Sequence, residues 1–534
     1  GCHGVTSSPR ALREATPARP MATNGAAAAQ PPADLGPVFA YLEAHEEVYV
    51  QRLKEAVAIR SVSAWVDHRP QILVMLEWAQ AWAVKLGASE ARLVDNPLLA
   101  TDATLPPMLL VTFDAECADA HLARTVCAYG HLDVQPARLE DGWDSEPFDL
   151  TELDGKLYGR GASDDKGPAL SWLWAVEAHR ELKLSLPVKL QLLFEGMEEY
   201  GSEGLPEFVK REAVKGGWLT DADHFVISDN QWLSRTTPCL TYGLRGVAYF
   251  VVQVEGGATD LHSGVYGGSV HEPLNDLVHL LATLREPVGK GGKMHHERIR
   301  VEGILNGIAP VTDEERKLYS TLDFDVKSYE VGDVKGHSLE SPDAESVLMA
   351  RWRWPTLSIH GVEGAFSDTG AKTVIPGCVK GKFSIRLVPG MEPDAVTKLV
   401  KAHLEKEWRD TIGSPLKLSV ECLHGGPAWL SRTDHPNYVA AAKAVERVYG
   451  RPPDFTREGG SIPVANWLSD ATQMNVVLLS TSACDDGAHA QNEKYNRANL
   501  VNGIKTLAAY LHEISALVGP RPSLCRCDPP TEAE

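Results

Sequence analysis

Residues 125–136 have the sequence TVCAYGHLDVQP, a short apolar run that ends in a histidine and an aspartate. The apolar part is long enough for one buried β-strand, and residues 188–195 and 224–228 form two further runs of the same kind. A stretch with helical character, residues 169–182, separates the first run from the second. This alternation predicts an α/β fold whose mostly parallel sheet carries helices on its faces.

Each of these predicted strands runs directly into polar residues. Ligands of open α/β sheets bind at the carboxyl ends of the strands, so the polar residues there locate the functional site. The residues in question are His131, Asp133, Glu198, Glu199 and Asp229.

A second set of elements interrupts the first. It consists of strand-like and helix-like segments at 248–254, 274–284, 381–388, 393–407 and 416–422. Their order predicts a smaller α+β domain, residues 243–426, inserted between two parts of the main domain, 37–242 and 427–518. Within the insert, the acidic and glycine-interrupted residues 314–344 are expected to form a long variable excursion.

Other elements complete the predicted main domain. They are an amphipathic helix at 38–59, a helix at 436–449, a strand at 475–479 and a helix at 498–517. Residues 1–36 are rich in Ala, Pro, Ser and Arg and resemble a disordered leader or a targeting segment. Because Met21 is a plausible start, the residues before it are left out of the predicted fold. Residues 519–534 are expected to be a C-terminal tail.

The composition excludes several classes of protein. A formal net charge of -20 over 534 residues argues against a nucleic-acid partner, whose phosphates need clustered Lys and Arg. The longest tempting apolar run, 247–254, is far too short to span a membrane. The cysteines are scattered singly apart from Cys525 and Cys527, which favours a reducing compartment. We therefore expect a cytoplasmic protein, with organellar targeting by the leader left open.

Three more motifs carry acids or histidine. Residues 159–167, GRGASDDKG, place two acids between glycines, and residues 195–204, EGMEEYGSEG, crowd several carboxylates after a strand. Residues 485–493, DDGAHAQNE, add a histidine in a turn-rich loop. Crowded carboxylates repel one another unless cations share them or solvent screens them. The ligand set suits a pair of Zn²⁺ or Mn²⁺ ions, and its members are His131, Asp164, Glu199, Asp229 and His489.

Each motif also has a simpler explanation. His131 and Asp133 could be a surface pair, Asp164 could cap the following helix, and the acidic run could be a solvated loop. If a metal binds, the Asp133 carboxylate can hold the imidazole of His131 in one tautomer. The side chains of adjacent Glu198 and Glu199 diverge in an extended chain, so one can bind metal while the other acts as a base.

From about Phe39 to about Leu517 the chain resembles the co-catalytic metallopeptidases, a family with carboxypeptidase, aminoacylase and dipeptidase members. Within that family it resembles the cytosolic nonspecific dipeptidases of the carnosine dipeptidase group. The motifs that carry the resemblance are GHLDVQPA, DGWDSEPF, GRGASDDKGP, FEGMEEYGSEGL, LHSGVYGGSVHE, GAKTVIPG, FSIRLVP, TREGGSIP and DDGAHAQNE. Departures at Asp368, Ala490 and 314–344 bear on substrate preference and lid shape. The resemblance implies a metallopeptidase domain with an inserted lid and dimerisation domain.

The resemblance also implies how the ligands are shared. Asp164 would bridge both ions, His131 and Asp229 would complete one, and Glu199 and His489 the other. The peptide bond after Asp164 would be cis, as a strained bond that the site tolerates.

For the reaction, the resemblance implies hydrolysis of a dipeptide by a water activated between the ions. Asp133 would support His131, Glu198 would be the general base, and His262 would stabilise the oxyanion. His262 belongs to the insert, and the resemblance implies that it enters the active site of the neighbouring subunit of a homodimer.

The substrate's free carboxylate would lie among Arg386, Thr373 and Ser461, since an arginine fork fits a carboxylate. One alternative is an N-acyl amino acid deacylase, which has the same ligands and a different pocket. A catalytically silent scaffold is the other, although Glu198 and every ligand are present. The choice of Zn²⁺ or Mn²⁺ and the physiological dipeptide stay open.

Overall fold

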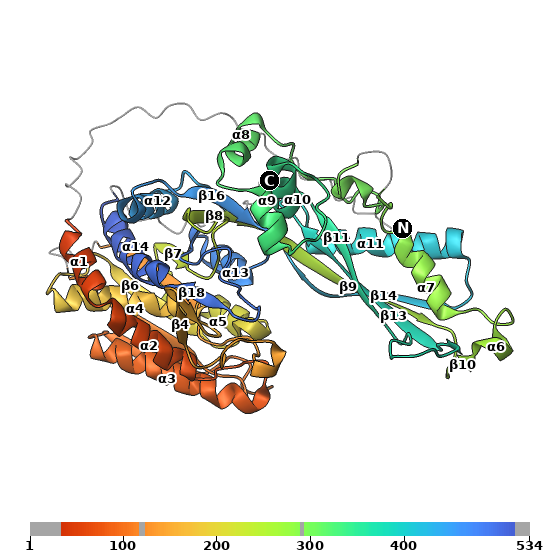
Figure 1. The fold of residues 1–534 in the computed structure, drawn as a ribbon, viewed down its shortest axis with the longest axis horizontal. Helices are drawn as coiled ribbons and strands as arrows, with labels where there is room; N and C mark the ends of the chain where they lie inside the picture. Colours follow the sequence, from red (N-terminus) through yellow and green to blue (C-terminus); the bar gives the residue numbers. More distant parts are fainter. Residues whose placement is uncertain (1–33, 117–122, 289–292, 518–534) are drawn as a thin grey trace, which may run out of the picture.

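The computed structural model describes residues 34–116, 123–288 and 293–517. The predicted tail with Cys525 and Cys527, and all but the last residues of the predicted leader, lie outside the described residues. The chain forms two lobes of unequal size (Figure 1). A nine-stranded sheet organises the larger lobe and a four-stranded sheet the smaller one, and each lobe has its own hydrophobic core.

The large sheet lies at the centre of the larger lobe. Its strands are β1 (Glu90–Val94), β2 (Met108–Phe113), β3 (Thr125–His131), β6 (Lys189–Glu195), β7 (His224–Ile227), β8 (Cys239–Leu244), β15 (Trp429–Leu430), β16 (Asp454–Glu458) and β17 (Val476–Leu479). They lie in the order β1-β2-β6-β3-β7-β17-β8-β15, with β16 beside β8. The central strands β6, β3, β7 and β17 are parallel, which confirms the predicted α/β fold with a mostly parallel central sheet. The antiparallel pairings toward the edges of the sheet, which involve β1, β2, β8 and β15, were not predicted from the sequence.

Helices cover this sheet, whose strands β3, β7 and β17 are buried along their whole length. The helices of this lobe are α1 (Gly36–Ala44), α2 (Glu46–Ala58), α3 (Arg69–Lys85), α4 (Lys166–Glu181), α5 (Leu205–Glu212), α12 (Pro436–Tyr449), α13 (Pro463–Thr472) and α14 (Arg497–Ser515). The single helix predicted at 38–59 is two helices that meet at His45, whose ring N–H donates to the Tyr41 carbonyl at 2.8 Å. Among the described residues, no helix has both the length and the apolar character needed to cross a membrane.

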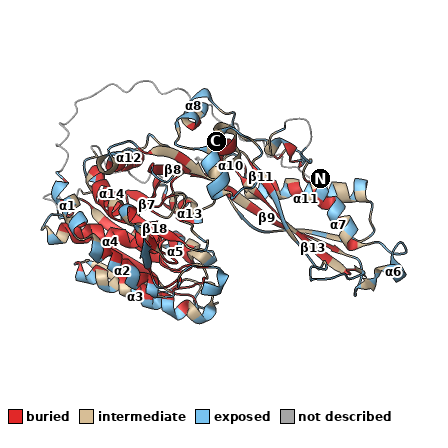
Figure 2. Cartoon of the chain, viewed as in Figure 1, coloured by how far each residue is buried: buried red, intermediate tan, exposed pale blue. Residues whose placement is uncertain are grey.

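The smaller lobe is built around four antiparallel strands. In the order β11-β13-β9-β14 they are β11 (Thr356–Glu363), β13 (Cys378–Leu387), β9 (Gly246–Glu255) and β14 (Lys417–Gly426). Helices α7 (Pro273–Ala282) and α11 (Pro393–Glu407) pack on this sheet and share its core. At the far end of the lobe, β10 (Leu261–His262) pairs with β12 (Val374–Ile375) beside the short helix α6 (Ser263–Tyr266) (Figure 1). Residues at this tip are exposed (Figure 2).

The chain passes between the two sheets at two neighbouring points. Strand β8 ends at Leu244 and β9 begins at Gly246, while β14 ends at Gly426 and β15 begins at Trp429. The two connections run side by side, because Gly426 is opposite Val247 and Trp429 is opposite Leu244.

Residues 313–352 contain α8 (Asp313–Thr321), α9 (Val326–Ser328), a π-helical turn at Tyr329–Asp333 and α10 (Ala344–Trp352). Their buried side chains form a small core that includes Leu233 of the larger lobe. The Glu315 carboxylate lies 3.0 Å from the guanidinium of Arg457 on β16. The predicted excursion 314–344 is therefore helical in part and also contacts the larger lobe. Ion pairs and apolar contacts across such distances in sequence leave no local pattern.

Candidate metal centre

The carboxyl ends of the parallel strands and two loops converge on one cluster of acids and imidazoles. His131 ends β3, Asp229 follows β7, and Glu198 and Glu199 lie in a short 3-10 turn after β6. The structure brings these residues together in two groups: His131, Glu198 and Asp229, and Asp164, Glu199 and His489. In each group, one ligand atom per residue lies within 4.8 Å of the others.

Asp164 lies between the two imidazoles. Its Oδ1 is 3.1 Å from His131 Nε2, and its Oδ2 is 3.1 Å from His489 Nε2. The Nε2 atom of His131 is 3.6 Å from Asp229 Oδ2, and that of His489 is 3.0 Å from Glu199 Oε2. One carboxylate thus offers a different oxygen to each group, which is the arrangement that a bridging ligand needs.

The backbone at Asp164 has the geometry that the resemblance implied. The Asp164–Asp165 peptide bond is cis. The Glu493 carboxylate accepts hydrogen bonds from the backbone N–H groups of Gly161, Ser163 and Asp164, at 2.9, 3.0 and 3.1 Å. Arg160 also donates to it at 2.9 Å. Glu493 was missed as a functional residue, although it ends the DDGAHAQNE motif, since its partners lie about 330 positions earlier.

Asp133 supports both metal groups at once. Its Oδ1 is 3.5 Å from His131 Nδ1, which also lies 3.1 Å from the Asp133 carbonyl oxygen. The same carboxylate accepts hydrogen bonds from the backbone N–H groups of Glu198, at 3.2 Å, and Glu199, at 3.1 Å. The turn that aims the two glutamates apart is therefore fixed by the residue that supports His131.

Protonation of the cluster reflects crowding and burial. Burial raises the pKa of Glu198 well above its usual range, and burial together with the nearby Asp164 and Glu199 carboxylates raises that of Asp229 to about 7, against the charge of His131. Hydrogen bonds with Asp164 and Glu199 raise the pKa of His489 to about 11. Because the pKa values of these groups are raised, divalent cations that bind here would displace protons.

The donor set fits a pair of divalent cations. Glu199 Oε1 is buried and has no hydrogen-bond partner among the described residues, so one ligand oxygen still lacks a partner. Imidazole nitrogens and carboxylate oxygens, with no thiol among them, suit Zn²⁺ or Mn²⁺. The His489 side chain keeps 58% of its surface exposed, so a small molecule can reach the cluster from this side.

A cavity of 690 Å³ opens onto these residues. Asp164, Asp229 and His489 line it, and so does Ser461. The Arg386 guanidinium donates to Ser461 Oγ at 3.2 Å, so two of the predicted carboxylate-binding residues lie together at its edge.

His262 and Thr373 lie elsewhere. Both are exposed residues at the tip of the insert, where the Ser263 N–H donates to the Thr373 carbonyl at 3.1 Å. The tip, marked by β10 and α6, is at the opposite end of the molecule from the ligand-bearing strands (Figure 1). The structure thus separates Thr373 from Arg386 and Ser461, and pairs it with His262.

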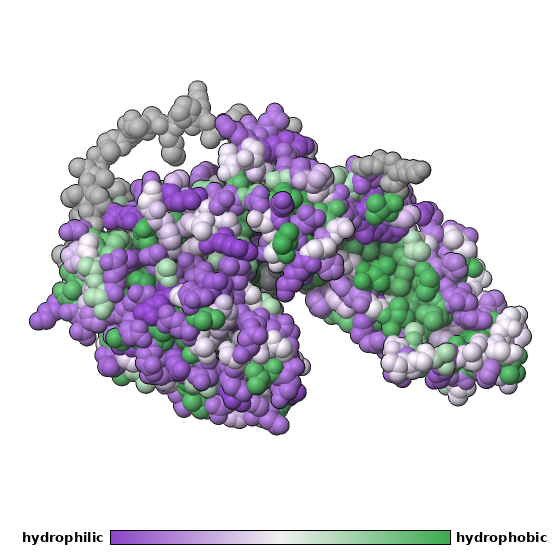
Figure 3. Space-filling model, in the orientation of Figure 1, coloured by the Kyte–Doolittle hydropathy of each residue, from purple (hydrophilic) through white to green (hydrophobic). Residues whose placement is uncertain are grey.

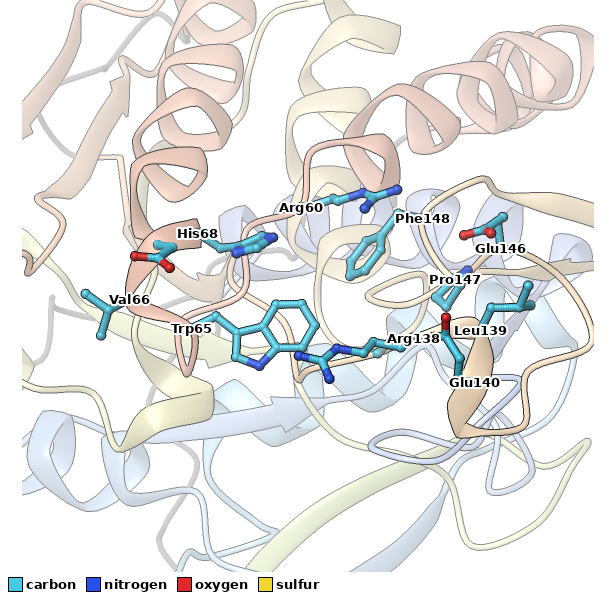
Figure 4. A pocket seen from close by; sticks show the side chains of 12 residues that line it. Arg60, Trp65, Val66, His68, Arg138, Leu139, Glu140, Glu146, Pro147 and Phe148 are labelled. Carbon is cyan, nitrogen blue, oxygen red and sulfur yellow. The ribbon is translucent and has the colours of Figure 1, made fainter.

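A second cavity, of 680 Å³, lies beside the segment that follows His131. Two guanidinium groups stack over aromatic rings there: Arg138 lies 4.8 Å from the Trp65 ring centre and Arg60 lies 5.3 Å from that of Phe148 (Figure 4). Its lining contains none of the candidate ligands.

Comparisons with known proteins agree with this geometry. Residues 127–513 match the model of Peptidase family M20/M25/M40. The chain is 45% identical to a Cys-Gly metallodipeptidase of Schizosaccharomyces pombe, with 90% of this chain and 99% of the relative covered. It is 43% identical to the human Beta-Ala-His dipeptidase, with 91% of this chain and 94% of that relative covered. The crystal structure of human carnosine dipeptidase 1 superposes with a TM-score of 0.80 at 42% identity, covering 91% of this chain and 100% of that one.

Proposed function

Because this chain belongs to Peptidase family M20/M25/M40, we propose that it is a di-metal dipeptidase that cuts the peptide bond of dipeptides with a free C-terminal carboxylate. Metallodipeptidases are 42% to 45% identical to it over about nine-tenths of its length, as for the yeast and human relatives. The observation that carries the proposal is Asp164, whose two oxygens face two different imidazoles, with Glu198 beside them.

The residues that would hold the ions are those predicted from the sequence. Asp164 would be shared, His131 and Asp229 would hold one ion, and Glu199 and His489 the other. When bound, two divalent cations lower the pKa of a water molecule between them and polarise the substrate carbonyl.

Glu198 is the proposed general base. It takes the proton of the attacking water and gives it to the departing amine. Burial raises the pKa of Glu198 well above its usual range, and neighbouring positive charge opposes this shift. Glu198 also lies within ligand distance of His131 and Asp229, so the experiment must distinguish a base from a ligand.

Arg386 and Ser461 are proposed to bind the terminal carboxylate. The guanidinium of Arg386 is half-buried, which lowers its pKa and strengthens its attraction for an anion. Ser461 Oγ donates to the Arg245 carbonyl at 2.6 Å and accepts from Arg386, so its position is fixed before substrate arrives.

His262 and Thr373 are proposed to act in the partner subunit of a homodimer. In their own chain they lie on the exposed tip, far from the ligands, whereas a neighbour's tip could complete the site. Figure 3 shows a hydrophobic patch on the surface of the insert, and exposed apolar side chains of that lobe include Ile359, Val362 and Phe366. Exposed apolar patches of this kind are typical of protein interfaces.

The deacylase alternative has the same ligands and differs in the pocket. Purified enzyme loaded with Zn²⁺ or Mn²⁺ should hydrolyse a panel of dipeptides, including Cys-Gly and β-Ala-His, and should leave the matching N-acetyl amino acids largely intact. Faster cleavage of N-acetyl amino acids than of dipeptides would mean that the protein is a deacylase and not a dipeptidase. Metal analysis of the same samples would give the number of ions per chain.

A further inference from the structure

Arg351 lines the metal-site cavity, and Arg245 and Arg386 both contact Ser461, which lines the same cavity. The charges of Arg386 and Arg351, together with burial, lower the pKa of Arg245 to about 10, and Glu458 is the acid that opposes them. Acids line the same cavity, among them Asp333, Glu458 and Asp485. An arginine there attracts an anionic group of a substrate only where no acid of the chain already pairs with it.

Two of these arginines already have partners. Arg245 donates to backbone carbonyls of Gly459, Ala350 and Trp354, at 3.1, 3.4 and 3.4 Å, and ties α10 to the larger lobe. Arg386 donates to Ser461 and is the proposed partner of the substrate's terminal carboxylate.

Arg351 is different, because its guanidinium makes no hydrogen bond or ion pair with any residue that the structure describes. It is held by rings instead, 4.9 Å from the centre of Tyr329 and 5.9 Å from that of Trp352. Both Arg351 and Tyr329 line the cavity that contains Asp164 and His489. A guanidinium held over an aromatic face keeps its N–H donors, which lie in the guanidinium plane, free for another partner.

The place of Arg351 indicates which part of a dipeptide it meets. A side chain at Gly459 would begin 2.9 Å from the Arg351 carbonyl oxygen, so α10 ends against the segment that carries Gly460 and Ser461. Those residues line the carboxylate end of the cavity. The end of α10 that carries Arg351 therefore lies beside the segment that would hold the substrate's terminal carboxylate.

We propose that Arg351 is a specificity-determining residue that binds an acidic side chain of the substrate's C-terminal residue. This inference rests on the proposed dipeptidase function. The free guanidinium supports it: among the described residues, Arg351 forms no ion pair within 4.0 Å with the acids of the cavity wall, such as Glu458 and Asp333, so a substrate carboxylate would meet a cation without an ion-pair partner. A planar fork over an aromatic ring binds carboxylate in preference to a neutral amide.

Asp333 is the competing carboxylate on the same wall. Burial raises the pKa of Asp333, and the charge of Arg351 opposes this shift, yet Asp333 forms no ion pair with Arg351 within 4.0 Å. The next acid, Asp485, is already paired with Lys494 at 3.1 Å and lies 3.6 Å from Arg235. Removing the charge of Asp333 should therefore strengthen binding of an acidic substrate, opposite to the effect of removing Arg351.

The test compares Gly-Glu with Gly-Gln, which have nearly the same shape and differ in one charge. In the metal-loaded enzyme, Arg351→Gln should lower the ratio of kcat/KM for Gly-Glu over Gly-Gln by about 10-fold or more, the usual effect of a lost charged hydrogen bond. Arg351→Lys should keep part of the ratio, and Asp333→Asn should raise it. Lys335→Gln removes another cation from the same cavity and should change the ratio less than twofold.

Each other outcome would contradict the proposed role of Arg351 in binding an acidic side chain. An equal fall for both substrates would mean that Arg351 acts on the terminal carboxylate or on folding, and an unchanged ratio would mean that it does not contact the side chain. Thermal unfolding of each variant shows whether the protein is intact. If wild-type enzyme cleaves neither dipeptide nor any other of the panel, the dipeptidase proposal itself fails, which is a separate result.

Discussion

One oxygen of the Glu493 carboxylate accepts a hydrogen bond from the backbone N–H of Asp164 at 3.1 Å, across 329 positions of sequence. Strands β4 (Thr151–Leu153), β5 (Lys156–Tyr158) and β18 (Lys494–Asn496) form a small sheet that brings the two segments together. Glu493 therefore positions the proposed bridging ligand although it does not reach the cluster itself.

We expect Glu493→Gln to weaken metal binding by about 10- to 100-fold, the usual effect of losing a residue that orients a ligand. A glutamine places an amide NH₂ among N–H donors, so at least one of Gly161, Ser163 and Asp164 loses its acceptor. Competition with a chelator measures the affinity, and excess metal should restore much of the turnover.

Glu513→Gln is a matched control for this variant. Glu513 is also buried and paired with an arginine, Arg447, but on α14, away from the ligands. It should lower the unfolding temperature without changing metal affinity. If both variants lose metal equally, the effect of Glu493 is general destabilisation.

Glu198→Gln should keep both metal ions and lose about 10² to 10⁴ in kcat, the typical contribution of a general base. Metal content per chain and turnover, measured on the same sample, check this. Glu199→Gln is the comparison, since it should lose metal as well as activity. A Glu198→Gln protein with one ion per chain would make Glu198 a ligand.

Mixing of inactive subunits tests the position of His262. His262→Ala and Glu198→Ala should each be nearly inactive, but a mixed dimer would hold one site with both changes and one intact site. After refolding together in equal amounts, about half the dimers are mixed and roughly a quarter of wild-type activity should return. Mass spectrometry of tagged subunits confirms exchange. No recovery after confirmed exchange would place His262 in its own subunit or outside the reaction.

The buried pair His179 and His512 predicts acid sensitivity. Their Nε2 atoms lie 2.9 Å apart, which leaves room for one proton between them, and His179 donates its Nδ1–H to the Ala175 carbonyl. Burial, His179 and Arg447 lower the pKa of His512 to about 4 from 6.5. The unfolded chain thus binds more protons between those values, so stability is full above pH 6.5 and falls as the pH drops toward 4.

His512→Gln can still donate to His179 and does not titrate. Between pH 7.5 and pH 5 it should lose about 1 to 2 kcal/mol less stability than wild type, from one shifted histidine. Urea unfolding of the variant and of wild type at both pH values measures this difference. The metal cluster titrates alike in the two proteins, so its contribution cancels. If the stability of the two proteins depends on pH in the same way, His512 is not a source of the acid sensitivity.

Local patterns were sufficient for the elements around the metal centre. Apolar runs predicted β3, β6 and β7, and each ends within a few residues of an acid or imidazole of the cluster. Helix 436–449 has the predicted bounds, because proline begins it and Gly450, in the left-handed region, ends it. The meeting of Asp164 with His489 came from the family resemblance, since no local pattern joins residues so far apart.

Other features depend on contacts that no short stretch encodes. Arg351 looks like one more charged residue of a helix until the fold brings Tyr329 and Gly459 to it. The antiparallel strands β2 and β8 are apolar like their parallel neighbours, so composition cannot give their direction. Thr373 shares the tip with His262 because β10 pairs with β12, a pairing of two residues on each side.

The paired connections between the two sheets have a mechanical consequence. Because Val247 and Gly426 are opposite each other, the chain passes between the lobes through two adjacent strands. Gly246 lets the two connections lie close together, since a side chain there would begin 2.3 Å from the Gly426 carbonyl oxygen. A larger residue at position 246 would push the two connections apart and shift the insert relative to the lobe that carries the metal centre.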